Sequence, residues 1–166
     1  LHGKTLGLVG IGNIAKAVAE RARAFGMTVI AYDKYVDSSP LAEMKPSLEA
    51  MVPEADYISM HLPLTDETRN MINAKCIKLM KDGVVIINTG RGLTVDADAM
   101  VAALESGKVA TYATDVWPSD PPPADYPLLK APNVLMAPHI GASSTENLLR
   151  IGEEACAHIE NFLGGK

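Results

Sequence analysis

Short apolar runs rich in β-branched residues alternate with longer segments of helical spacing along the whole chain. Six of the short runs predict strands, at Leu6–Val9, Thr28–Tyr32, Ile58–Met60, Val84–Ile87, Val109–Ala113 and Val134–Met136. The run Val84–Ile87 has no polar alternation, which is typical of a strand buried on both faces of a parallel sheet. This alternation predicts the α/β class, with a single domain built on a doubly wound parallel sheet with right-handed crossovers.

Helices are predicted between these strands. Apolar positions recur at helical intervals from Ile14 to Phe25, and Gly26 ends that helix. Two further helices are predicted at Asn73–Met80 and Ala97–Glu105, each followed by a glycine suited to a helix C-cap. The proline-rich segment Pro118–Pro132 is predicted to be a rigid loop, since a strand follows it.

A long last helix is predicted to start near Ser143. Ser143 and Glu146 have the Ser-x-x-Glu spacing of a capping box, in which each side chain bonds the other residue's backbone N–H. The helix would carry one apolar stripe, made of Leu148, Ile151, Ala155, Ile159 and Phe162. The pair Gly164 and Gly165 is expected to stop it.

Composition narrows the class of protein. The 166 residues are 48% hydrophobic and 21% charged, as in an ordinary globular protein. A net charge of −5 without a basic run argues against binding to nucleic acid or to an anionic membrane. The chain has neither an apolar stretch near the ~18 residues of a spanning helix nor an N-terminal signal-peptide pattern. Cys76 and Cys156 lack Cys-x-x-Cys spacing, so each is predicted to be a buried thiol in a reducing, cytoplasmic compartment.

A glycine motif lies between the first predicted strand and the first predicted helix. Gly10, Gly12 and Ala15 form the pattern Gly-x-Gly-x-x-Ala. Gly10 permits a tight turn, and Gly12 removes a side chain that would keep a pyrophosphate away from the backbone. The N–H groups of Gly12, Asn13 and Ile14 would then face the phosphates at the positive end of the helix. Glycines also mark plain strand-to-helix turns, so the motif alone is a weak signal.

Asp33 strengthens the prediction of a dinucleotide site. It ends the second predicted strand, 21 residues after Gly12. A carboxylate there can accept both ribose hydroxyls of an adenosine and would repel a 2′-phosphate, which favours NAD over NADP. Asp33 could instead be a surface aspartate in a strand-end turn. The predicted site could also bind another adenosine ligand, such as S-adenosylmethionine, in place of NAD.

Polar residues that could act on a substrate follow three later strands, where the carboxyl ends of a doubly wound sheet place its ligands. Arg91, between two glycines, could grip a carboxylate through two parallel hydrogen bonds. His139 could be a general acid or base, because an imidazole titrates near neutral pH. Asp120 could orient His139, although spacing alone does not establish that pair. Arg91 could instead be a surface arginine in a strand-to-helix loop, and His139 could be structural. No pair of histidines has the spacing of metal ligands, so no metal is predicted.

The chain resembles a known family through five motifs that occur in order: Leu1–Gly10 leading into the glycine motif, His61–Thr65, Asn88–Gly92, Asp115–Trp117 and Pro138–Gly141. They are similar to the NAD-binding domain of the D-isomer-specific 2-hydroxyacid dehydrogenases, which include D-3-phosphoglycerate, glycerate/hydroxypyruvate, D-lactate and formate dehydrogenases. The resemblance runs from Leu1 to the last helix, and it implies a Rossmann fold and NAD as the cofactor.

The resemblance also implies roles for individual residues. Arg91 would hold the substrate carboxylate and carbonyl, and His139 would exchange the hydroxyl proton with a 2-hydroxy or 2-keto acid. Asp33 would bind the adenosine ribose. The remaining cofactor contacts would come from Asn13 and Ile14 at the pyrophosphate, Leu62, Pro63, Thr89 and Gly90 along the channel, and Asp115, Gly141 and Ala142 beside the nicotinamide.

Two departures from the family pattern bear on activity. The glutamate that usually partners the histidine aligns with Asp120, whose shorter side chain either weakens the bond to His139 or is brought closer by its loop. The family's substrate domain is absent, so we interpret residues 1–166 as an NAD-binding domain with little or no turnover alone. The resemblance also implies a homodimer through this domain. The alternative function is a non-catalytic NAD-binding or sensing module, like the family's transcriptional corepressors, and the sequence does not identify which 2-hydroxy acid is used.

Overall fold

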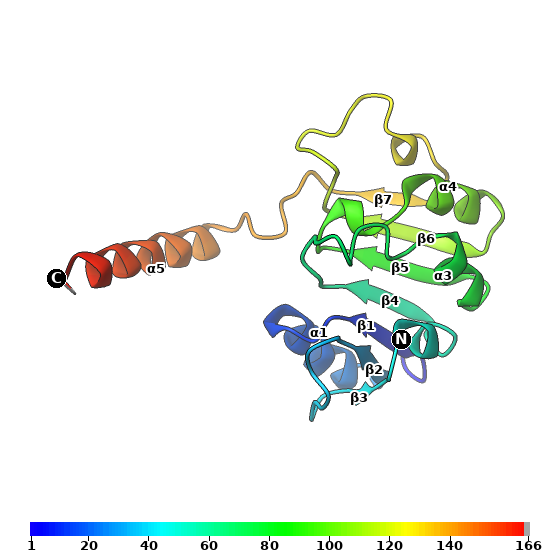
Figure 1. The fold of residues 1–166 in the computed structure, drawn as a ribbon, viewed down its shortest axis with the longest axis horizontal. Coiled ribbons are helices and arrows are strands. Elements are labelled where there is room, and N and C mark those ends of the chain that lie inside the picture. The colour runs from blue at the N-terminus through cyan, green and yellow to red at the C-terminus, as the bar shows by residue number, and fades with distance from the viewer. Residues whose placement is uncertain (165–166) are drawn as a thin grey trace.

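A seven-stranded parallel sheet forms the centre of the molecule (Figure 1). The computed structural model describes residues 1–164. The strands run in the order β3-β2-β1-β4-β5-β6-β7, and every neighbouring pair is parallel. Their bounds are β1 Thr5–Val9, β2 Thr28–Tyr32, β3 Glu43–Met44, β4 Tyr57–Met60, β5 Val84–Asn88, β6 Val109–Thr114 and β7 Val134–Met136. The order reverses at β1, which confirms the predicted doubly wound α/β sheet.

The connections contain five α-helices and two short 3₁₀ turns within the described residues. The α-helices are α1 Asn13–Ala24, α2 Leu48–Met51, α3 Ala74–Leu79, α4 Ala97–Glu105 and α5 Thr145–Gly164. The 3₁₀ turns are η1 Gly92–Thr94 and η2 Pro127–Leu129, the second inside the proline-rich segment. The sequence pattern missed α2 and β3, because four and two residues are too short to show a period.

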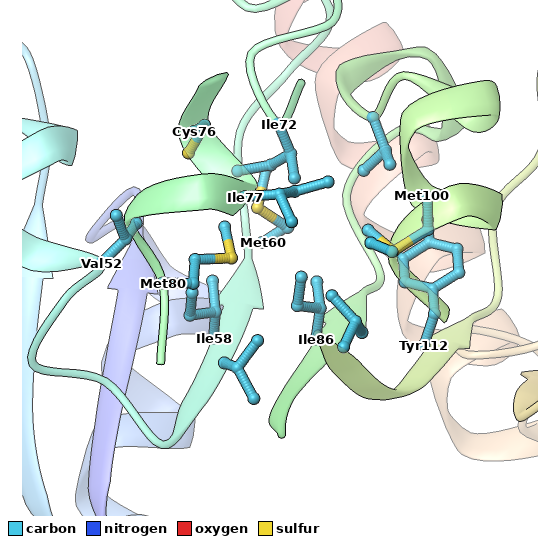
Figure 2. Packing of buried hydrophobic residues seen from close by; sticks show 14 of the residues in the cluster. Val52, Ile58, Met60, Ile72, Cys76, Ile77, Met80, Ile86, Met100 and Tyr112 are labelled. Atoms are coloured by element: carbon cyan, nitrogen blue, oxygen red, sulfur yellow. The ribbon is translucent and has the colours of Figure 1, made fainter. Parts of the chain in front are cut away.

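The core consists of two clusters of buried side chains. The larger includes Ile58, Met60, Ile86, Met100 and Tyr112, which lie between the central strands and the helices that cover them (Figure 2). The smaller forms where the buried alanines of α1 pack against β1 and β2. Burial of this apolar surface, at about 25 cal/mol per Å², is the main term that stabilises the sheet.

Burial along β5 differs from the prediction. Val84 and Ile86 are buried, but Val85 and Ile87 are only half-buried, so the strand is not enclosed on both faces. Ile87 lies in an open hollow of about 260 Å³ beside Leu135 of β7, whose side chain is 65% exposed. The apolar run therefore reflects one well-packed face and one half-buried face.

The last helix begins one residue later than the predicted cap implies. The Ser144 hydroxyl accepts a hydrogen bond from the backbone N–H of Asn147 at 3.1 Å, which makes Ser144 the capping residue. The backbone N–H of Ser143 instead donates to the carbonyl of Ile140 in the preceding turn, 2.9 Å away. The predicted Ser143–Glu146 capping box is therefore wrong.

Helix α5 projects away from the sheet (Figure 1). None of its residues is buried, and Phe162 in its apolar stripe is 76% exposed. Cys156 on this helix is exposed, so the prediction of a buried thiol fails there, because α5 packs against no core. Cys76 is buried as predicted, and burial raises the pKa of its thiol to about 12. Gly165 lies outside the described residues.

No helix within residues 1–164 is both long and apolar enough to span a membrane.

One carboxylate ties together the amino ends of the central strands. Asp56, just before β4, accepts the N–H of Thr5 at 2.8 Å and the ammonium of Lys81 at 3.0 Å. The backbone bond from Thr5, assisted by Lys81, lowers the pKa of Asp56.

We expect Asp56→Ala to lower the free energy of unfolding at pH 7 by about 1 kcal/mol, because the half-buried N–H of Thr5 loses a charged acceptor. Since the folded pKa of Asp56 is depressed, its contribution is present above the unfolded pKa of about 3.9 and is lost as pH falls through the folded value. Urea unfolding at pH 7 and pH 3 measures both effects. Asp37→Ala, at an exposed aspartate, is the control, and an equal loss at both pH values would contradict the prediction.

Candidate active site

The carboxyl ends of all seven parallel strands lie at one edge of the sheet, where the loops carry the predicted site residues. The order reverses between β1 and β4, which is the usual position of the ligand crevice in such sheets. The loops after β1, β2 and β4 enclose a cavity of about 480 Å³ there. It is lined by Gly10, Gly12, Tyr32, Asp33, Lys34, Tyr35, His61, Leu62, Pro63, Thr65, Glu67, Thr68 and Met71.

The glycine motif leaves space for a phosphate group. Gly10 has φ +91°, and a Cβ on it would lie 2.9 Å from Leu62 Cδ2, so a side chain is excluded by both conformation and contact. A Cβ on Gly12 would meet nothing within 4 Å, because it would point into the open space beside the cavity. Asn13 and Ile14 are exposed in the first turn of α1, where helical N–H groups have no acceptor within the helix. This arrangement fits a pyrophosphate.

Asp33 is fixed in the cavity by two backbone hydrogen bonds. Its Oδ2 accepts the N–H of Ile11 at 3.0 Å, and its Oδ1 accepts the N–H of Tyr35 at 2.9 Å. The first bond ties the end of β2 to the glycine motif. Each carboxylate oxygen can accept a second bond, so the group retains the capacity to receive two ribose hydroxyls.

The opposite wall of the cavity comes from the loop after β4. Leu62, Pro63 and Met71 give it an apolar surface suited to a planar base. His61 bonds the Ser59 hydroxyl at 2.9 Å through Nε2, and burial lowers its pKa, which favours the neutral imidazole. Apart from Leu62 and Pro63, this wall was not predicted, because its residues follow no period that a single sequence reveals.

Arg91 is held by a buried amide that the sequence reading did not single out. Asn88 has no solvent exposure. Its Nδ2 donates to the Arg91 carbonyl at 3.0 Å and to the Tyr112 hydroxyl at 3.2 Å, and its Oδ1 accepts the Gly90 N–H at 3.0 Å. Thr94 also donates to the Arg91 carbonyl, at 2.7 Å. Asn88 and Thr94 therefore hold the backbone of Arg91, the residue that carries the guanidinium, in place.

The structure brings Asp120 and His139 into contact. Asp120 Oδ2 lies 2.6 Å from His139 Nδ1, and the side chains are 52% and 48% exposed. His139 has φ +56°, a left-handed conformation that is uncommon outside glycine. The proline-rich loop thus brings the shorter carboxylate within hydrogen-bonding distance of the imidazole.

Asp115 stabilises the turn that follows His139. Its two oxygens accept the N–H groups of Ile140 at 2.9 Å and Gly141 at 2.6 Å. A Cβ on Gly141 would lie 2.8 Å from Asp115 Oδ2, so this contact requires glycine. Ala142 completes the turn, and its carbonyl accepts Asn147 Nδ2 at 2.7 Å.

Thr89 and Gly90 connect the two halves of the site. Thr89 and Asp115 line the open hollow of about 260 Å³ next to β5. A Cβ on Gly90 would approach the carbonyl oxygen of Leu62 to 3.0 Å, so the loops after β4 and β5 pack backbone to backbone here. Residues 1–164 contain no cluster of three or more His, Cys, Asp or Glu side chains that could hold a metal ion.

Comparison with known proteins identifies the family. The sequence model described as "D-isomer specific 2-hydroxyacid dehydrogenase, NAD binding domain" matches residues 1–141. The chain is 46% identical over 166 residues to a hydroxypyruvate reductase of Thermotoga maritima, covering 99% of this chain and 54% of that protein. It is 41% identical over 170 residues to a glyoxylate reductase of Aeropyrum pernix, covering 100% of this chain and 50% of that protein.

Solved structures agree with the sequence comparison. A D-lactate dehydrogenase from Aquifex aeolicus, complexed with NAD and lactic acid, has a TM-score of 0.88 and 36% identity, covering 98% of this chain and 54% of that chain. A NAD-dependent formate dehydrogenase from Staphylococcus aureus, in complex with NAD, has a TM-score of 0.90 and 35% identity, covering 98% and 49%. The chain thus spans about half the length of the relatives it matches. These findings confirm NAD as the cofactor, and the chain belongs to the NAD-binding domain family of the D-isomer-specific 2-hydroxyacid dehydrogenases.

Proposed function

We propose that this chain is the cofactor domain of an enzyme that transfers a hydride between NAD and a D-2-hydroxy acid or its 2-keto acid. The observation that carries the proposal is the 2.6 Å contact between Asp120 and His139, at the sheet edge that also carries Arg91 and the glycine motif. A carboxylate–imidazole pair supplies a proton acceptor, and a guanidinium supplies a carboxylate receptor. Oxidation of a 2-hydroxy acid requires both, because the hydroxyl must lose its proton and the carboxylate must be held in place.

The cavity at the switch point would hold the adenosine half of NAD. Gly10, Gly12, Asn13 and Ile14 would receive the pyrophosphate, and Asp33 would accept the ribose hydroxyls. The channel would continue over Leu62, Pro63, Thr89 and Gly90 to the turn of Asp115, Gly141 and Ala142. NAD bound in this way would supply the two-electron acceptor or donor for the hydride.

Arg91 would bind the substrate carboxylate. One of its guanidinium N–H groups is used, because Nη1 donates to the Gly90 carbonyl at 2.7 Å. The remaining donors suffice for a bidentate grip on a carboxylate. The bonds from Asn88 and Thr94 to the Arg91 carbonyl limit movement of this residue during turnover.

His139 would move the proton. Asp120 occupies Nδ1, so Nε2 is the nitrogen that can face the substrate. During oxidation, Nε2 accepts the hydroxyl proton as the C2 hydride leaves, and the adjacent carboxylate stabilises the resulting imidazolium. During reduction, Nε2 returns the proton to the carbonyl oxygen.

A second domain is expected to complete the site. The relatives are about twice the length of this chain, and a domain that closes over the substrate would exclude water and hold the acid in place. We propose a cytoplasmic location, supported by two free cysteines, and a homodimer, supported by the exposed apolar stripe of α5. The names of the relatives favour a short 2-keto acid such as hydroxypyruvate or glyoxylate.

The alternative function was a non-catalytic NAD-binding module, suggested by Asp120 in place of glutamate. The contact between Asp120 and His139 supports the enzyme instead, because the shorter side chain reaches its partner.

Asp33→Ala tests the cofactor site. We expect it to weaken NAD binding about 10- to 100-fold, since the ribose would lose two hydrogen bonds to a charged acceptor, and to weaken discrimination against NADP. Titration calorimetry of the chain with NAD and with NADP measures both. Asp37→Ala is the matched control. Unchanged NAD affinity in Asp33→Ala would mean that Asp33 only shapes the turn after β2.

A further inference from the structure

An ion pair joins the two walls of the nucleotide cavity. Lys34 directly follows Asp33 at the end of β2, whereas Glu67 lies in the loop after β4. Lys34 Nζ lies 2.6 Å from one carboxylate oxygen of Glu67 and 2.7 Å from the other. Both residues line the same cavity as Asp33. The two loops are therefore linked across the crevice by charged side chains.

Stability alone does not account for this pair. The side chains of Lys34 and Glu67 are 53% and 61% exposed, and ion pairs this exposed contribute little to stability because water and salt screen them. The position of the ion pair says more about its role than its contribution to stability does. The pair lies beside the carboxylate that would receive the adenosine ribose, where a cofactor with a 2′-phosphate differs from one without.

The charges in the cavity are unbalanced. Among its lining residues, all within the described part of the chain, Asp33 and Glu67 are acidic and Lys34 is the one lysine or arginine. His61 also lines the cavity, but burial lowers the pKa of its imidazole and disfavours a positive charge there. Both carboxylate oxygens of Glu67 contact the Lys34 ammonium. A 2′-phosphate would thus meet a site in which the available cation is already neutralised.

We propose that Glu67 is a determinant of cofactor choice, because it holds Lys34 and so denies a 2′-phosphate the one cation in the cavity. The inference rests on the proposed binding of NAD in this cavity. Asp33 repels the phosphate directly, and Glu67 reinforces the effect from the opposite wall. Selectivity is then divided between the loop after β2 and the loop after β4.

Glu67→Gln tests the proposal. The substitution preserves size and removes the charge, so Lys34 becomes free to pair with a phosphate. We expect the affinity for NADP to rise about tenfold, as one unit charge a few ångströms from a phosphate in a half-open site can give, while NAD affinity changes less than about threefold. Calorimetric titration of the full chain with both dinucleotides gives the ratio. The gain should shrink as salt is added, because the charges at the cavity mouth are screened.

Two further variants make the test specific. Lys34→Gln combined with Glu67→Gln should abolish the gain, because the released cation is then absent. Glu54→Gln is the matched control, since it removes the same charge from a Lys45–Glu54 ion pair of 2.7 Å that lies outside the cavity lining. It should leave the NADP to NAD ratio unchanged.

The outcomes separate the two proposals. If the unchanged chain binds neither dinucleotide, the proposed function fails, and this inference fails with it. If the chain binds NAD and Glu67→Gln leaves the ratio of affinities unaltered, the inference alone is overturned. A gain that survives in the double variant, or that Glu54→Gln also produces, would trace the effect to net charge and would likewise overturn it.

Discussion

Replacing His139 with Gln in the proposed two-domain enzyme is expected to lower kcat by about 10²- to 10⁴-fold, the range found when a general acid–base group is lost. The amide has similar hydrogen-bonding reach but cannot exchange a proton at neutral pH. The site geometry supports a large effect, because Asp120 binds Nδ1 and leaves Nε2 as the nitrogen that can serve the substrate. Steady-state oxidation of 2-hydroxy acids and reduction of 2-keto acids measure the loss in both directions.

NAD binding separates a chemical role for His139 from a structural one. His139 lies in a left-handed turn whose following N–H groups are held by Asp115, so the turn has support that does not depend on the imidazole. We therefore expect NAD affinity to change less than about threefold, far below the tenfold that 1.4 kcal/mol of lost binding would give. His158→Gln, at an exposed histidine of α5, is the control. Turnover that survives in His139→Gln would remove the acid–base assignment.

The sheet was predictable because its strands are encoded locally. Each apolar run is bounded by glycine or a polar turn, and burial rewards the same residues that favour strands. The prediction failed where context decides. Val85 and Ile87 look like core residues in sequence, but both are only half-buried, and Ile87 lines the open hollow next to β7.

The burial of helix α5 also could not be predicted from the sequence. Its amphipathic pattern correctly predicts a long helix, yet periodicity indicates an apolar face and not what covers that face. None of its residues is buried, and Cys156 is exposed with the rest. The cap was misplaced by one position, because two adjacent serines offer the same hydroxyl and only the turn at Ile140 determines which one caps the helix.

The part of the candidate site that could be predicted consists of residue types that have few other roles at such positions. Gly10, Gly12 and Asp33 occur at the spacing of a dinucleotide-binding motif, and the structure places all three around one cavity. Asn88 was missed, although it lies within a quoted motif, because a sequence does not tell a fully buried amide from an exposed one. The ion pair of Lys34 with Glu67 was also missed, since it joins residues 33 positions apart in two loops without a periodic pattern.

Asp120 is the residue on which sequence and structure differ most in what they imply. Its side chain is one methylene shorter than the glutamate expected from the family resemblance, which questions the bond to His139. The 2.6 Å separation from Nδ1 shows that the bond is present. Trp117, immediately before the proline-rich loop that carries Asp120, donates Nε1 to the carbonyl of Ala137, immediately after β7, at 2.9 Å. This contact ties the loop to the strand that leads into His139.

We therefore expect Asp120→Asn to lower kcat by about 10²- to 10⁴-fold, because an amide can donate to Nδ1 and favour the wrong tautomer, and it cannot stabilise the imidazolium. Asp120→Glu restores the charge with a longer reach, and we expect it to keep kcat within about tenfold of the unchanged enzyme. Both variants should bind NAD as the unchanged enzyme does, because Asp120 lies outside the cavity at the switch point. A purely structural aspartate would give the opposite pattern, with the larger glutamate disrupting the loop and the isosteric asparagine tolerated. Comparing kcat and NAD affinity for the two variants therefore decides whether the charge or the shape of Asp120 matters.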